Sequence, residues 1–211
     1  MDAGIHTIII ADDHPLFGVA LRLGVQRVAP DAEVIEVDSF AALRDAAHRH
    51  PNTSLVLLDL MMPDVEGLSA LQFLRDEFPR LRVAIVSGAP AQTWVRAAEA
   101  LGAVAFVPKS TAPTQTQNIL RTLLEGGSWW PEPKTISAAA DSVDSRIERL
   151  SRQELRILLR IKDGKLNKQI ADELSIAEST VKTHITMLLR KLDLQSRTQA
   201  AVLAQRVLTG S

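Results

Sequence analysis

The chain has 211 residues, is 46% hydrophobic and contains no cysteine. This length allows one large domain or two small ones, and the lack of cysteine excludes disulfides and thiolate metal sites. No apolar run approaches the roughly 20 residues that span a bilayer, and the N-terminus does not resemble a signal peptide. We therefore expect a globular, cytoplasmic protein with no membrane partner.

The net charge of −1 conceals opposite charges in the two halves of the chain. Residues 1–130 carry ten Lys and Arg against fifteen Asp and Glu, a net charge of −5. Residues 146–211 carry thirteen against seven, a net charge of +6. This asymmetry predicts two domains with different partners, the second of which binds a polyanion.

Residues 1–125 alternate short aliphatic or β-branched runs with segments of helical spacing. We predict strands at 7–11, 33–37, 55–58, 82–86 and 103–107, and helices that include 41–48, 68–78, 93–100 and 116–124. Gly102 and Gly126 stand where helix C-caps are expected. Strands that alternate with helices predict an α/β fold, a doubly wound sheet of five parallel strands covered on both faces.

Residues 126–147 are rich in glycine, proline, serine and small residues, so we expect a linker between a first domain at 1–125 and a second at 148–211. Trp129 and Trp130 are expected to pack back onto the first domain, and 138–147 has the composition of a helix.

The last 64 residues read as a small all-α domain of four helices. Ser151 and Glu154 form a capping box that opens a helix ending near residue 162. Further helices are predicted at 167–174, 178–192 and 197–207.

Polar residues follow the first, third, fourth and fifth predicted strands, at the carboxyl ends of the strands of a 2-1-3-4-5 sheet. They are Asp12, Asp13, Asp59, Ser87 and Lys109. Ligands of doubly wound sheets bind outside these carboxyl ends, and clustered carboxylates repel one another unless a cation lies between them. Oxygen ligands of this kind suit Mg²⁺. Any single aspartate here has the simpler explanation of capping the next helix, but that does not account for the whole set.

The segments IADDHPLF, LLDLMMPDVEG, VSGAP and FVPKS resemble the signatures of response-regulator receiver domains, whose fold is flavodoxin-like. The resemblance covers about residues 5–125. It implies that Asp59 accepts a phosphoryl group from a histidine kinase, and that Asp13, Asp59 and the backbone carbonyl of Met61 bind Mg²⁺. Asp12 would assist, partly through water.

The same resemblance implies that Ser87 contacts the phosphoryl group, that Lys109 pairs with it, and that Phe106 is an aromatic switch. An ordinary core aromatic is an equally good explanation of Phe106. His14 has no nucleophile or metal partner by spacing, so we expect a plain loop residue there. Asp64 is expected to be a solvated or capping charge.

The helix predicted at 178–192 has an apolar stripe and a separate polar face. The stripe comprises Val181, Ile185, Leu188 and Leu192, which follow helical spacing. A recognition helix has this pattern, and so does any amphipathic surface helix. The basic charge favours a helix-turn-helix that binds DNA.

Residues 149–204, with TVKTH, KLDLQSRTQAA and NKQIADEL, resemble the helix-turn-helix domain of NarL/LuxR-type regulators. The resemblance implies a set of DNA contacts, with Lys191 as a weaker candidate, and a dimer through the last helix. The set is Lys168, Thr180, Lys182, Thr183, Thr186 and Arg190. Two departures are Ala177, where a Ser or Thr N-cap is usual, and Thr186, where a longer polar residue is common.

Together these features predict a transcription regulator in which Mg²⁺-dependent phosphorylation of Asp59 modulates dimerisation and promoter binding. Its partners would be a histidine kinase, promoter DNA, RNA polymerase and a second copy of the chain. It would not be an enzyme beyond assisting its own phosphoryl transfer and dephosphorylation. Two alternatives are a regulator that is independent of phosphorylation and an Mg²⁺ phosphatase with an aspartyl nucleophile. The phosphatase would need a second aspartate where Met61 stands.

Overall fold

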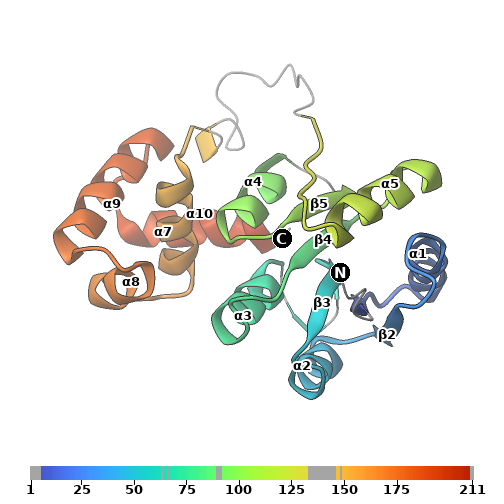
Figure 1. The fold of residues 1–211 in the computed structure, drawn as a ribbon. Coiled ribbons are helices and arrows are strands. Elements are labelled where there is room, and N and C mark those ends of the chain that lie inside the picture. Colours follow the sequence, from blue (N-terminus) through green and yellow to red (C-terminus); the bar gives the residue numbers. More distant parts are fainter. Residues whose placement is uncertain are drawn as a thin grey trace. The chain divides into compact units, whose positions relative to one another are not determined.

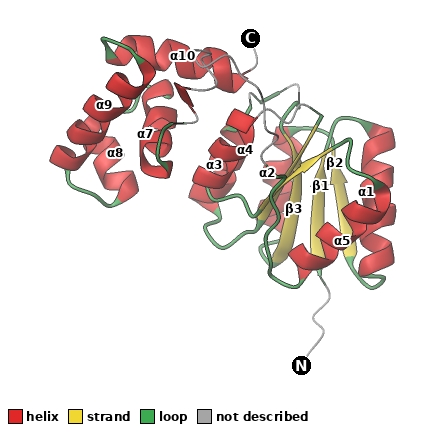
Figure 2. Ribbon diagram, turned by 90° about the horizontal axis from the view of Figure 1, so that it is seen from above, coloured by secondary structure: helices red, strands yellow, loops and turns green. Residues whose placement is uncertain are grey.

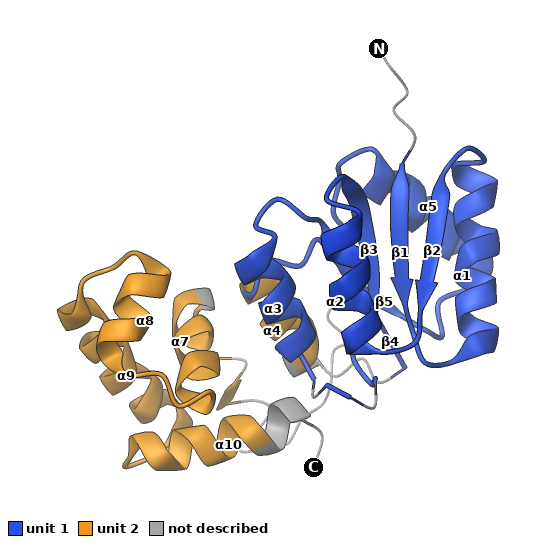
Figure 3. Cartoon of the chain, turned by 90° about the horizontal axis from the view of Figure 1, so that it is seen from below, with its two compact units in different colours: residues 1–90, 101–132 blue, residues 91–100, 133–211 orange. Residues whose placement is uncertain are grey.

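The computed structural model describes residues 6–62, 64–65, 67–88, 92–132, 146–147 and 149–209. It forms two compact units, Met1–Pro90 with Leu101–Glu132 and Ala91–Ala100 with Pro133–Ser211 (Figure 3). The second unit therefore includes residues 91–100, which the sequence places in the first domain. None of the helices in the described ranges is long and apolar enough to cross a membrane.

The first unit contains a parallel sheet with the strand order β2-β1-β3-β4-β5, as predicted (Figure 1). The strands are β1 (Thr7–Ala11), β2 (Glu33–Val37), β3 (Thr53–Asp59), β4 (Val83–Ser87) and β5 (Ala105–Pro108). The last three differ from the prediction by one or two residues at their ends. As a result, Asp59 and Ser87 are the last residues of their strands, where the sheet still fixes their backbone.

Alternate residues of the strands point to opposite faces of the sheet. One face packs Ile8, Ile10, Leu55 and Leu57 against α1 (Pro15–Val28) and α5 (Pro113–Leu124), in a cluster of buried side chains. On the other face lie α2 (Phe40–Arg49) and α3 (Ser69–Glu77), so the sheet is covered on both sides (Figure 2). The resulting fold leaves the carboxyl ends of the strands free to build a site.

Trp129 packs back onto the first unit, as predicted. Its side chain lies against the α1/α5 cluster. Its backbone pairs with β5, because the Trp129 N–H donates to Val104 and the Trp129 carbonyl accepts from Phe106. The helix expected at 138–147 falls almost entirely outside the described residues.

The second unit contains α4 (Gln92–Ala100), α7 (Arg152–Lys162), α8 (Asn167–Leu174), α9 (Glu178–Leu192) and α10 (Arg197–Thr209). Helix α7 contacts α9, α10 and α4, and α8 contacts α9. The predicted apolar stripe of α9 forms part of the core: Val181, Leu188 and Leu192 are buried and Ile185 is half-buried.

The helix ends follow the sequence closely. The capping box of Ser151 and Glu154 is present at the start of α7. Ala177 is the N-cap of α9 and provides no side-chain hydrogen bond, yet the helix begins at Glu178 as predicted. Gly102 and Gly126 have φ angles of +88° and +89°, which favour glycine at these helix ends.

Candidate functional site

The carboxyl ends of β1, β3 and β5 bring two carboxylates and a lysine into direct contact. Lys109 Nζ lies 2.8 Å from Asp12 Oδ2 and 2.8 Å from Asp59 Oδ2. Both aspartate side chains are 1% exposed, and that of Lys109 is 15% exposed. The sheet order explains these contacts. β1 and β3 are adjacent and β5 lies two strands from β3, and the carboxyl ends of these parallel strands lie on the same side of the sheet.

The charges of the aspartates determine the state of Lys109. Burial alone would lower the pKa of its ammonium group, but hydrogen bonds and charge attraction from Asp12 and Asp59 outweigh burial and raise that pKa. Lys109 Nζ also lies 4.8 Å from the centre of the Phe17 ring, a cation–π distance. The lysine is therefore held as a cation directly beside the Asp59 carboxylate.

Backbone contacts fix the residues around Asp59. The Met61 N–H donates to Asp59 Oδ1 at 3.1 Å. Ser87 is buried, and its carbonyl accepts the Lys109 N–H at 2.8 Å. Phe106 is fully buried in β5, opposite Ile85 of β4. The sequence predicts that each of these residues acts in phosphoryl transfer or switching. Met61 and Ser87 lie at the carboxyl edge of the sheet with Asp59, whereas Phe106 lies within β5, two residues before its end.

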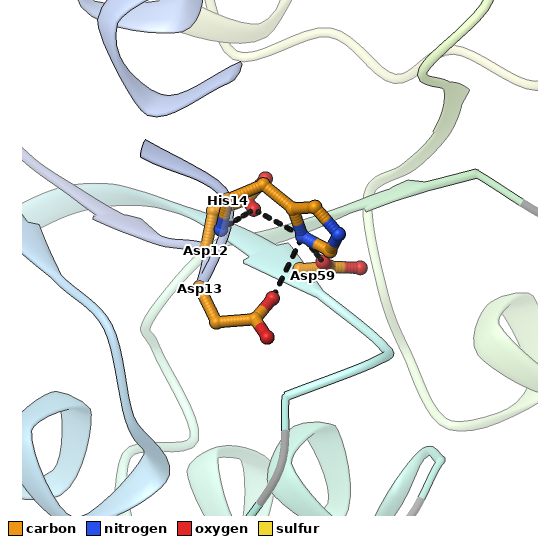
Figure 4. Close-up of side chains that lie close together, drawn as sticks. All are labelled: Asp12, Asp13, His14 and Asp59. Atoms are coloured by element: carbon orange, nitrogen blue, oxygen red, sulfur yellow. Dashed lines mark hydrogen bonds and ion pairs between the residues drawn. The ribbon is translucent and has the colours of Figure 1, made fainter. Parts of the chain in front are cut away.

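His14 is not the plain loop residue expected from its spacing. Its Nδ1 lies 2.8 Å from Asp13 Oδ1, 3.2 Å from Asp12 Oδ1 and 3.6 Å from Asp59 Oδ2 (Figure 4). The turn after β1 causes this, because the His14 N–H donates to Asp12 Oδ1 at 2.8 Å and brings the ring over the carboxylates. Sequence spacing does not reveal a contact made by such a turn.

The donor set fits a divalent cation. Within the described residues, Asp12, Asp13, His14 and Asp59 each offer a ligand atom, and these atoms lie within 4.8 Å of one another. Asp12 Oδ2 and Asp13 Oδ1 are buried atoms that accept no hydrogen bond within the described part of the chain, although Lys109 lies 2.8 Å from Asp12 Oδ2. Carboxylate oxygens are the ligands that Mg²⁺ prefers.

Asp64 holds the loop after β3 against another helix. Its two carboxylate oxygens accept the N–H groups of Phe40 and Ala41, at 2.8 and 3.0 Å. These bonds, the one from Phe40 first, lower the pKa of Asp64. The expectation of a capping charge is confirmed, but the capped helix is α2, which lies earlier in the chain. The loop that follows Asp59 is thereby tied to the first turn of α2.

The second unit exposes the residues predicted to contact DNA. Thr180, Lys182, Thr183, Thr186 and Arg190 are exposed on α9, and Lys168 is exposed near the start of α8. The Thr183 and Thr186 hydroxyls donate to carbonyls one turn earlier. They therefore face solvent with acceptor lone pairs and methyl groups.

Not every basic residue of this unit is available to a ligand. Lys182 pairs with Glu178 one turn earlier at 3.0 Å, but both side chains remain largely exposed. Lys191 lies 2.7 Å from Glu154 Oε2, whose side chain is 1% exposed. Lys191, a weaker candidate for a phosphate contact, thus has a structural partner in α7.

Comparison with known proteins agrees with both parts of the structure. A model of the response regulator receiver domain matches residues 8–121. A model of the luxR family of bacterial regulatory proteins matches residues 148–204. The chain is a response regulator of the LuxR type.

Several relatives match nearly the whole length of the response regulator. It is 35% identical to the glycerol metabolism activator of Pseudomonas putida, over 94% of this chain and 95% of that protein. It is 33% identical to the transcriptional regulatory protein LiaR of Bacillus subtilis, over 94% and 96%. The virulence regulator BvgA of Bordetella pertussis is 32% identical over the same shares.

Solved structures support the fold of the response regulator. A structure of two RcsB dimers bound to two parallel DNAs superposes with a TM-score of 0.58 at 22% identity, over 97% of this chain and all of that one. RcsB of Salmonella enterica, bound to a promoter with a phosphomimetic, gives 0.58 at 23% identity over 96% and 99%. The family matches make the chain a DNA-binding two-component response regulator, a class not generally counted among enzymes.

Proposed function

We propose that Asp59 is the residue that a histidine kinase phosphorylates, and that this modification controls promoter binding by α9. The observation that carries the proposal is the contact of the buried Asp59 carboxylate with Lys109 at 2.8 Å, beside Asp12 and Asp13. A carboxylate of this kind can attack phosphorus to give an acyl phosphate. Asp12 shares this burial and the contact with Lys109. We assign the phosphoryl group to Asp59 because Asp59 is the aspartate that the receiver-type segment LLDLMMPDVEG places at the end of β3.

In the proposed reaction, one Asp59 oxygen attacks the phosphorus of the kinase's phosphohistidine. The phosphorus–nitrogen bond breaks, and the imidazole nitrogen keeps its electron pair. Lys109 balances the negative charge of the phosphoryl oxygens, and the Met61 N–H holds the carboxylate in place. We assign Mg²⁺ to Asp13, Asp59 and the Met61 carbonyl, with Asp12 assisting. When bound, this ion neutralises charge on the transferring group.

Ser87 and Phe106 are proposed to transmit the modification. Ser87 would contact the phosphoryl group, and its displacement would alter the packing of the buried Phe106 ring in the adjacent strand. Such a change biases a two-state surface rather than creating a new one.

The proposed DNA surface consists of the exposed polar face of α9 and the start of α8. Lys182, Thr183 and Thr186 would approach base edges or adjacent phosphates, and Lys168 and Arg190 would contact backbone phosphates. Thr180 would belong to the same DNA-binding surface. The net charge of +6 over residues 146–211 supports binding to DNA. RcsB binds DNA as dimers in its solved structure, and we propose that this regulator likewise dimerises on DNA, through its last helix. We further propose domains at 1–125 and 148–211 joined by 126–147, a cytoplasmic location and contact with RNA polymerase.

The test compares wild type with Asp59→Asn in labelling and in DNA binding. Acetyl phosphate with Mg²⁺ should label wild type at Asp59, leave Asp59→Asn unlabelled, and tighten promoter binding in a gel-shift assay of wild type alone. Asp64→Asn is the matched control, because Asp64 lies in the same loop but outside the carboxylate cluster. Undiminished labelling of Asp59→Asn would remove Asp59 as acceptor, and unlabelled protein with full promoter switching would remove the phosphorylation switch.

A further inference from the structure

Among the described residues of the carboxylate cluster that could bind a metal ion, His14 is the one that offers a nitrogen. Its ring reaches the cluster from the turn between β1 and α1, where His14 is the N-cap of α1 and makes no side-chain capping bond. The N–H bond to Asp12 Oδ1 fixes the backbone of His14, so its ring lies close to the carboxylates by virtue of the fold. The His14 side chain is 61% exposed, which leaves its other nitrogen open to water.

The distances from His14 Nδ1 match a ligand set around one ion. Neighbouring ligands of an octahedral ion with bonds of about 2.1 Å lie about 3 Å apart. Nδ1 lies 2.8 Å from Asp13 Oδ1 and 3.6 Å from Asp59 Oδ2, and both carboxylates belong to the proposed metal site. In the tautomer with hydrogen on Nε2, the Nδ1 lone pair faces these oxygens.

Lys109 Nζ also lies 3.4 Å from His14 Nδ1, so an ion bound to this nitrogen has to displace the ammonium group from it. Lys109 lies 2.8 Å from both Asp12 and Asp59, and among the described residues the ion-pair partner of Asp13 is His14. Asp13 Oδ1 is a buried atom that accepts no hydrogen bond within the described ranges, and the same holds for Oδ2 of the almost fully buried Asp12. The nitrogen beside Asp13 Oδ1 is His14 Nδ1, at 2.8 Å, so in the tautomer with hydrogen on Nε2 this oxygen accepts no hydrogen bond among the described residues and is open to an ion.

We propose that His14 Nδ1 is a ligand of the divalent ion, together with Asp13 and Asp59, and that the site selects a first-row transition metal such as Mn²⁺ or Co²⁺ over Mg²⁺. This inference rests on the proposed metal site of the receiver. Mg²⁺ strongly prefers oxygen ligands, whereas imidazole increases affinity for transition metals. One nitrogen among carboxylates therefore shifts the preference of the site without preventing Mg²⁺ from binding through the oxygens.

The competing role for His14 is a second counter-charge. A ring that carries hydrogen on Nδ1 donates to Asp13 at the observed 2.8 Å and makes no bond to metal. In that role His14 screens the carboxylates in the absence of an ion and discriminates little between metals. The two roles predict different spectra of the bound ion.

The experiment uses the full chain loaded with Mn²⁺ and labelled with ¹⁵N-histidine. Pulsed electron paramagnetic resonance should detect nuclear coupling from a directly bound histidine nitrogen, and His14→Ala should abolish it. Calorimetry should show Mn²⁺ affinity reduced about tenfold or more by His14→Ala, with Mg²⁺ affinity changed less than about threefold. His48→Ala is the matched control, because His48 is an exposed histidine of α2 outside the cluster. His14→Asn repeats the test with a polar side chain if His14→Ala unfolds.

The outcomes separate this inference from the proposed function. Mn²⁺ that binds without nitrogen coupling, or equal losses of Mn²⁺ and Mg²⁺ affinity in His14→Ala, overturns the His14 assignment and leaves Asp59 phosphorylation standing. A chain that binds neither ion overturns the His14 assignment together with the proposed metal site, and failed Asp59 labelling identifies that case.

Discussion

Glu154 provides the sharpest prediction for the stability of the DNA-binding unit. Its side chain is 1% exposed and accepts from the Ser151 N–H at 2.6 Å and from Lys191 Nζ at 2.7 Å. It therefore joins the start of α7 to α9. Glu154→Ala removes both bonds and leaves the Lys191 ammonium, whose side chain is 30% exposed, without its partner.

Removing one partner of a buried ion pair typically costs about 3–5 kcal/mol of stability. The cost should be near the lower value here, because the Lys191 ammonium group that remains can reach water. We therefore expect Glu154→Ala to lower the free energy of unfolding by about 3 kcal/mol. The double variant Glu154→Leu/Lys191→Met should cost less than the sum of its single changes, with a coupling of about 1–3 kcal/mol. Lys182→Ala, which breaks the exposed pair on the same helix, should cost no more than about 0.5 kcal/mol.

Urea unfolding followed by far-ultraviolet circular dichroism measures these differences. Burial alone would raise the pKa of Glu154, but the bonds from Lys191 and Ser151 outweigh it, and the folded pKa is lowered. The stabilisation should thus be complete above the unfolded pKa of about 4.3 and disappear as the pH falls through the lower folded value. A cost below about 1 kcal/mol, or single effects that add within about 0.5 kcal/mol, would refute the proposed link between the helices.

Three further results are expected. Asp64→Ala should lower the unfolding free energy by about 1 kcal/mol through loss of the α2 cap. Because the pKa of Asp64 is lowered in the folded state, this difference should vanish on acidification below about pH 3.9. A pH-independent difference in urea titrations would contradict this. Mg²⁺ at about 100 times its dissociation constant should stabilise wild type by about 2.7 kcal/mol in thermal scans, and equal stabilisation of Asp13→Ala would exclude Asp13 as a ligand. Lys182→Ala should reduce the salt dependence of promoter affinity by about one ion, measured by fluorescence anisotropy across salt concentrations, and an unchanged slope would place Lys182 away from the phosphates.

The sheet and the helices of both units could be predicted because each has a strong local signal. Apolar runs of strand length, bounded by glycine or polar residues, gave the five strands, and the parallel order followed from their alternation with helices. The cluster of Asp12, Asp59 and Lys109 could be predicted because the carboxyl ends of parallel strands meet at one edge. In these cases, local pattern and topology together determine the contact.

The contacts that could not be predicted are made by side chains whose direction or partner depends on the folded structure. Spacing said nothing about His14, because a turn of two residues sets the direction of its ring. Asp64 caps a helix that begins 24 residues earlier, and the helical pattern does not show that Lys191 turns toward Glu154, 37 residues before it. Such pairings depend on how elements pack, which no short window of sequence contains.

The pairing of Trp129 with β5 also affects how the sheet meets other chains. β5 is the last strand in the sheet order, and the unpaired N–H and C=O groups of an edge strand can recruit a strand from another molecule. Trp129 occupies this edge at Ala105, donating to Val104 and accepting from Phe106. The chain thus blocks part of its own edge against strand addition, and association of two copies along that part of β5 has to use side chains.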